Sequence, residues 1–179
     1  MYLNHYFDPV DFQLINKKVQ LKNKYILGHY IENYTNKVDA GIIHKTDIAI
    51  LGVPNVNGIW DEEEVLSIEK IRIELYQLAS LDDKINIIDF GNLKRTKNQK
   101  ESHLALRDVV DYLNELNIVS IIIGGSQDIS YGVCKCFNNE PFFTFSVIDA
   151  LLDIKKGIEQ FNSTNYLTRI FNTNHNLFQ

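Results

Sequence analysis

The sequence predicts an α/β fold, a three-layer sandwich in which helices cover both faces of a mostly parallel sheet. Four short apolar runs, rich in β-branched and aromatic residues, are nearly continuous rather than alternating, which is typical of strands buried on both faces. Helical patterns lie between and after these runs, with apolar residues three and four positions apart. Because strand and helix alternate strictly, we expect right-handed βαβ units.

The individual elements follow from these patterns in chain order. Strands are expected at 47–53, 85–90, 118–123 and 142–148. Helices are expected at 62–79, at 101–117, from Asp128 to Phe137, and from Asn162 or Ser163 to Phe171, with Asp128 able to cap the third of them.

The domain organisation predicted from the sequence has two parts. Residues 1–45 are less regular and are interpreted as an N-terminal extension packed on the domain, whereas residues 46–179 belong to a single α/β domain. The predicted sheet is incomplete at its C-terminal end, because the sequence stops where a further strand is expected. Such a sheet leaves an unpaired edge. We therefore expect either a piece of a larger fold, or a second copy or another partner over that edge.

Composition excludes several classes of protein. The formal net charge is −5, and Lys and Arg are scattered, which argues against a nucleic-acid partner. No apolar run approaches the ~20 residues of a membrane span, and the N-terminus has no secretory signal pattern. The two cysteines, Cys134 and Cys136, are too close in sequence for an easy disulfide and do not form a zinc pattern. A cytoplasmic protein is expected.

Three segments carry motifs near the ends of predicted strands. The first is GVPNVNG at 52–58, followed by Ile71-Arg72 in the next helix and DFGNL at 89–93. The second is GGSQD at 124–128, and the third is DALLD at 149–153. In this order the segments resemble motifs of the ureohydrolase family (arginase, agmatinase and formimidoylglutamase), most closely formimidoylglutamase. The resemblance implies an arginase-like fold, with residues 46–179 as its N-terminal part.

The resemblance also implies a chemistry. In this family two manganese ions activate a bridging hydroxide, which attacks the carbon of a guanidinium or formimino group. The implied cofactor is therefore manganese, and the implied partner is a small-molecule amidine or guanidino substrate. Ureohydrolases are usually oligomers, so a homo-oligomer is expected. The motif positions near the implied site are Gly124, Gly125, Gln127, Asp128 and Leu151.

The sequence departs from the family pattern where metal is bound. Gln127 and Leu151 stand where the family has histidine ligands. Glutamine is a weak neutral ligand, and leucine cannot bind a metal ion. Asp149 and Asp153 remain as candidate metal ligands, and two carboxylates do not make a dinuclear manganese cage. No catalytic residue is assigned.

Two functional hypotheses follow. The chain is either part of a C–N hydrolase of the formimidoylglutamase type, inactive on its own because metal ligands are absent, or a non-catalytic binding or scaffolding protein on the same fold. A third interpretation is an unrelated α/β domain. Asp149 and Asp153 can mark a vestigial polar site or make ordinary strand-end hydrogen bonds, Asp128 can cap its helix or point into a cleft, and Asp89 is expected to form a turn.

Overall fold

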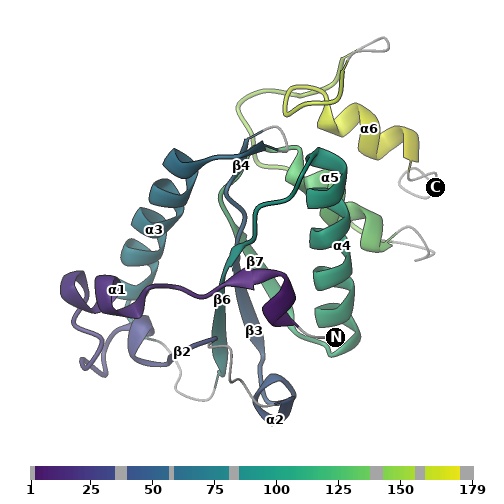
Figure 1. Ribbon diagram of the computed structural model, residues 1–179. Coiled ribbons are helices and arrows are strands. Elements are labelled where there is room, and N and C mark those ends of the chain that lie inside the picture. The colour runs from purple at the N-terminus through teal and green to yellow at the C-terminus, as the bar shows by residue number, and fades with distance from the viewer. Residues whose placement is uncertain are drawn as a thin grey trace. The chain divides into compact units, whose positions relative to one another are not determined.

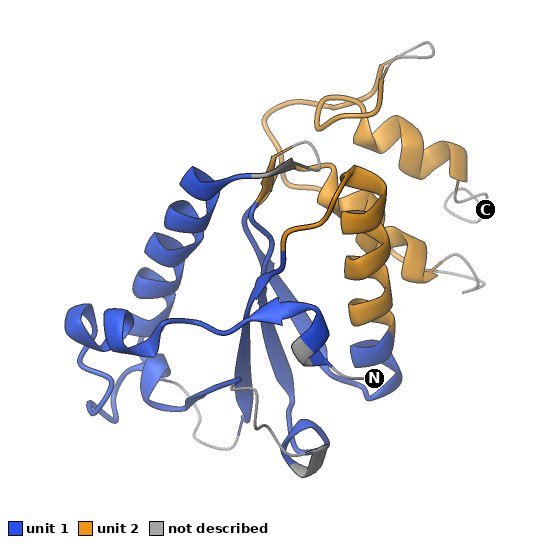
Figure 2. Ribbon diagram, viewed as in Figure 1, with its two compact units in different colours: residues 1–54, 61–94, 112–124 blue, residues 55–60, 95–111, 125–179 orange. Residues whose placement is uncertain are grey.

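The computed structural model describes residues 3–34, 40–56, 59–80, 85–137, 143–155 and 160–173. The chain forms two compact units that alternate along the sequence (Figure 2). Unit 1 comprises residues 1–54, 61–94 and 112–124, and unit 2 comprises residues 55–60, 95–111 and 125–179. Each unit is described below by itself.

Unit 1 is built on a mixed but mostly parallel sheet (Figure 1). Strand β6 (Ile87–Leu93) pairs in parallel with β3 (Ile48–Gly52), and β3 pairs in parallel with β7 (Val119–Ile123). The other side of β6 carries two short strands, β2 (Ile31–Asn33) in parallel and β1 (Phe7–Asp8) antiparallel. The predicted α/β fold with a mostly parallel sheet is therefore confirmed.

The two longer helices of unit 1 begin at side-chain caps. In α1 (Phe12–Lys18) the Asp11 carboxylate accepts the backbone N–H groups of Gln13 and Leu14. In α3 (Glu62–Gln77) the Asp61 carboxylate accepts the N–H of Glu64 at 3.0 Å. Each bond satisfies a donor that the first helical turn leaves unpaired. The shorter elements are α2 (Ala40–Ile43) and the 3₁₀ turns η1 (Leu3–His5) and η2 (Leu27–His29).

The core of unit 1 lies where α1 and α3 meet the sheet. Ile15 of α1 and Ile68 of α3 are fully buried in one apolar cluster with strand residues such as Ile50 and Ile87. Burying a side chain of this size stabilises the fold by about 1.5–3 kcal/mol relative to an exposed one. Residues 3–34, for which the sequence predicts an irregular extension, thus contribute a core helix as well as β1 and β2.

Unit 2 contains the short antiparallel pair β4 (Asn55–Val56) and β5 (Ile59–Trp60) together with most of the chain's C-terminal half. Its helices are α4 (Gln99–Glu115, whose last turn belongs to unit 1), α5 (Ile129–Cys134), the 3₁₀ turn η3 (Lys135–Phe137) and α6 (Tyr166–Thr173). A small cluster of Cys134, Tyr166, Leu167 and Ile170 forms its apolar core. All four predicted helices are present.

One predicted strand is wrong. Residue 142 lies outside the described residues, and residues 143–148 form no strand. The run is apolar enough for a buried strand, but its end is open to solvent, and Ile148 is fully exposed. A strand needs a paired backbone, and among the described residues of unit 2 the strands are β4 and β5, which pair with each other.

No helix in the described part of the chain combines the length and the apolarity needed to cross a membrane.

Candidate functional site

The glycine pair after β7 makes the turn that the sequence predicts. Gly124 and Gly125 both have φ +80, a conformation that side-chain-bearing residues rarely adopt. A Cβ atom on Gly124 would lie 2.3 Å from Cγ1 of Ile68, which is part of the α3 face buried in unit 1. Glycine is therefore required at position 124 by backbone conformation and by space.

Gln127 and Asp149, distant in sequence, are brought together in unit 2. The side-chain amide of Gln127 donates a hydrogen bond to Oδ2 of Asp149. The other carboxylate oxygen accepts the backbone N–H of Leu151 at 3.0 Å. The backbone bond, opposed slightly by burial and assisted by Gln127, lowers the pKa of Asp149 below its usual value. The exposed carboxylate is held ionised, with both of its oxygens engaged.

The remaining positions of the third motif do not complete a metal site. Leu151 is 74% exposed and offers no lone pair to a cation. Asp153 is half-buried in the same segment, which forms no strand. In the part of the chain that the structure describes, no three His, Cys, Asp or Glu side chains gather closely enough to hold a metal ion. These residues therefore do not fit a pair of manganese ions.

Asp128 is buried at the start of α5, but its carboxylate does not cap the helix as predicted. Its Oδ2 accepts a hydrogen bond from Nε2 of Gln99 at 3.0 Å and lies 3.1 Å from Nε2 of His103. Its Oδ1 accepts the hydroxyl of Ser126. The burial of Asp128 raises its pKa, but the hydrogen bonds from His103, Ser126 and Gln99 outweigh burial, so the net pKa is below the usual value. The carboxylate joins α4 to α5 within unit 2.

His103 occupies an aromatic environment on α4. Its ring meets the rings of Tyr131 and Phe161 edge-on, with centroid separations of 5.7 and 5.4 Å. Gly132 of α5 allows this approach, because a Cβ atom there would lie 3.1 Å from Cα of His103. His103 is therefore a packed core residue with a carboxylate partner and is not open to a ligand.

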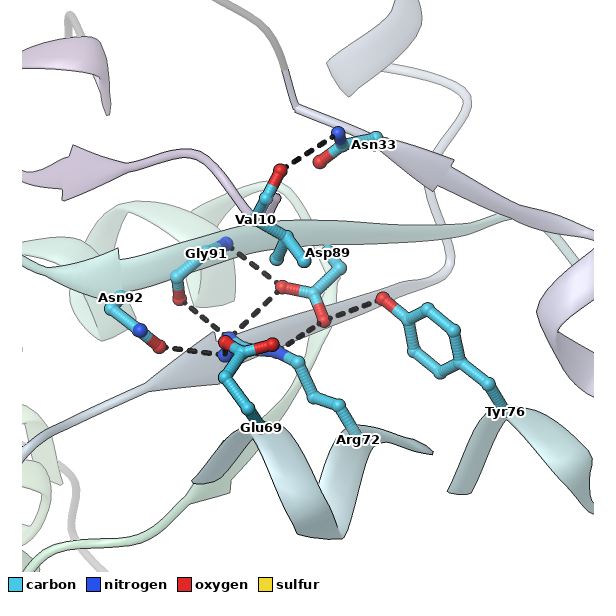
Figure 3. Close-up of polar contacts among 8 residues, drawn as sticks. All are labelled: Val10, Asn33, Glu69, Arg72, Tyr76, Asp89, Gly91 and Asn92. Carbon is cyan, nitrogen blue, oxygen red and sulfur yellow. Dashed lines mark hydrogen bonds and ion pairs between the residues drawn. The ribbon is translucent and has the colours of Figure 1, made fainter. Parts of the chain in front are cut away.

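A second polar cluster lies in unit 1, where Arg72 of α3 is fully buried against β6 (Figure 3). Its Nε donates to Oδ2 of Asp89 at 2.8 Å, and its Nη2 donates to Oδ1 of Asp89 at 3.2 Å and to the carbonyl of Gly91 at 2.9 Å. Its Nη1 donates to Glu69 at 2.8 Å and to Oδ1 of Asn92 at 2.7 Å. The five N–H donors of the Arg72 guanidinium are therefore matched by five hydrogen bonds to groups of the protein.

Electrostatics in this cluster follow from the pairing. Burial lowers the pKa of Arg72, but the carboxylates of Asp89 and Glu69 overcome this effect and raise it. Burial and the Asp89 carboxylate also raise the pKa of Tyr76, whose hydroxyl donates to Oδ2 of Asp89 at 2.9 Å. The expected role of Asp89 as a turn former is thus incomplete. Its Oδ1 does accept the N–H of Gly91, as in an Asx turn, but its main partner is Arg72.

The motif comparison marks Arg72 but gives it no partner, and no motif marks His103, although each residue carries a signal. Arg72 follows the buried Ile68 by four residues and precedes the buried Tyr76 by four, so it lies on the core face of its helix. His103 precedes the buried Leu106 by three residues and extends the apolar stripe of α4. A polar residue on an apolar helical face is the observable sign of a buried pair.

The two thiols are not candidates for nucleophilic chemistry. Burial raises the pKa of Cys134 to about 12. Burial and nearby Asp111 raise the pKa of Cys136 to about 11. Because the thiolate is the nucleophile, both groups are inert at neutral pH.

The comparisons with known proteins gave matches to solved structures alone. No protein-family model matches the sequence, and the search of curated proteins gave no match. A formiminoglutamase from Trypanosoma cruzi with Mn²⁺ matches with 17% identity and a TM-score of 0.60, over 70% of this chain and 48% of that chain. An arginase superfamily protein from Trypanosoma cruzi matches with 16% identity and a TM-score of 0.60, over 73% of this chain and 51% of that one. A variant of the same formiminoglutamase with Mn²⁺ gives a TM-score of 0.61 at 17% identity, over 72% and 48%.

These matches identify the fold. The chain has a partial ureohydrolase-like fold, and it spans about half the length of the solved structures it matches. Identities of this size carry the backbone arrangement and do not carry an activity.

Proposed function

We propose that this chain is a non-catalytic binding or scaffolding member of the ureohydrolase-like fold, with a degenerate metal site. The observation that carries the proposal is the hydrogen bond from the Gln127 amide to the Asp149 carboxylate. These two residues occupy motif positions that the resemblance assigns to metal binding. In this chain the neutral Gln127 amide donates a hydrogen bond to the Asp149 carboxylate. The carboxylate therefore needs no cation to stabilise it.

The chemistry of the two replaced positions supports the proposal. The amide nitrogen of Gln127 has no lone pair for a metal ion, and it is the nitrogen that faces Asp149. Leu151 has no ligating atom at all. A dinuclear manganese site needs several charged or imidazole ligands, and two carboxylates do not supply them. The site is better suited to hydrogen-bonding a neutral or cationic small molecule than to activating water.

Metal binding tests the proposal directly. Manganese titration of the complete protein, followed by electron paramagnetic resonance, is expected to show no tight binding of a pair of ions. The double variant Gln127→His, Leu151→His restores two imidazoles and is expected to bind manganese more tightly than wild type. Asp149→Asn in the double-variant background is the matched control, and it should remove the gain. Wild-type protein that already binds two manganese ions tightly overturns the proposal.

A second candidate function is hydrolysis of a C–N bond in a linear amidine or guanidino compound, as in formimidoylglutamase. The observation that favours it is the exposed Asp149 carboxylate, whose lowered pKa keeps it ionised. It would require further ligands from outside the residues discussed here. Complete protein incubated with manganese and a panel of formimino and guanidino substrates decides the question. Turnover that Asp149→Asn abolishes establishes this candidate and removes the first.

The proposed partners follow from the same comparison. A small-molecule amidine or guanidino compound is the ligand class to screen first for binding, with thermal stabilisation of the protein as the readout. Self-association into a homo-oligomer is also proposed.

A further inference from the structure

We draw no further inference here: the strongest candidate, the surface patch of unit 1 formed by Lys17, Lys18, Lys22 and Lys24 beside the exposed ring of Tyr25, carries nothing, because nothing in the structure shows which anionic group covers it.

Discussion

Arg72 on α3 and Asp89 on β6 form a two-point ion pair in which neither side chain has any solvent exposure. The contacts are 2.8 Å from Nε to Oδ2 and 3.2 Å from Nη2 to Oδ1. A planar guanidinium matches a carboxylate in this fork-to-fork geometry, and lysine does not. The pair fixes α3 on the sheet. Because both charges are buried, each replaces the hydration that water gives the other in the unfolded chain.

Removal of one partner should therefore be costly. Arg72→Met leaves Asp89 buried without its cation, and we expect the free energy of unfolding to fall by about 3–5 kcal/mol. Urea unfolding of wild type and variant measures the change. Arg107→Met is the matched control, because the Arg107–Asp108 pair is 41% exposed on both sides, and it should cost about 0–1 kcal/mol. Equal losses for both variants would contradict a special role for the buried pair.

Asp128 should make the stability of the protein sensitive to acid. Hydrogen bonds lower its pKa in the folded state, so the folded protein binds this proton less tightly than the unfolded chain does. The resulting stabilisation is present above the unfolded pKa of about 3.9 and is lost as the pH falls through the lower folded value. Unfolding curves of wild type and Asp128→Asn across the acid range measure it. The advantage of wild type should shrink as the pH falls, and an advantage independent of pH would count against this explanation.

Gly124→Ala should destabilise the fold through two separable effects. The φ of +80 strains any side-chain-bearing residue by about 1–3 kcal/mol, and the new Cβ would overlap Ile68. In Ile68→Ala the crowding atom Cγ1 is absent, so the double variant should lose less stability than the sum of the two single variants. Thermal unfolding of all four proteins gives the coupling between the sites. Strict additivity would mean that backbone strain alone accounts for the loss.

The thiols should be protected by folding. With pKa values of about 12 and about 11, Cys134 and Cys136 carry little thiolate at neutral pH. We expect native protein to react with a disulfide reagent at least about 100-fold more slowly than protein unfolded in urea, where a free cysteine has a pKa of about 8.5. Variants with Ser at one position assign each rate. If the thiols of native protein react as fast as those of unfolded protein, the segment formed by α5 and η3 opens readily.

Much of the sheet could be predicted because buried parallel strands leave a clear pattern. The continuous apolar runs located β3, β6 and β7 to within a few residues. Strands β1 and β2 could not be found in this way, because two or three residues are too few to show a period. Residues 143–148 have the same apolar composition as a strand, and composition alone does not reveal whether a backbone partner is present.

One helix start differs from the prediction because of a cap outside the apolar stripe. The helix expected at 101 begins at Gln99, because the Asn98 carbonyl side chain accepts the N–H of Glu101 and the Glu101 carboxylate accepts the N–H of Lys97. The Asn98 side chain thus caps the first turn, and the Glu101 carboxylate holds the residue before it, just ahead of the apolar stripe.

The candidate site was predicted in part. The motif spacing singles out Gln127 and Asp149, and the structure joins these two residues by a hydrogen bond. The roles of Asp128 and His103 depend on a contact between residues 25 positions apart, and no local pattern encodes it. Asp128 stands directly before a helix, so in sequence it looks the same whether its carboxylate caps that helix or pairs with His103. Metal binding by Asp149 and Asp153 stays a prediction.

Strand β6 has neighbours on both sides, with β3 along one and β1 and β2 along the other, whereas β7 has a neighbour on one side among the described residues. Amide protons differ accordingly in how they exchange with deuterated water. Those of β6 exchange only when the sheet opens as a whole, and they report the global stability of unit 1. Every second amide of β7 points away from β3, and among the described residues no other strand pairs with it, so it is expected to exchange faster. The contrast between the two strands therefore separates the global opening of unit 1 from local exchange at the edge of its sheet.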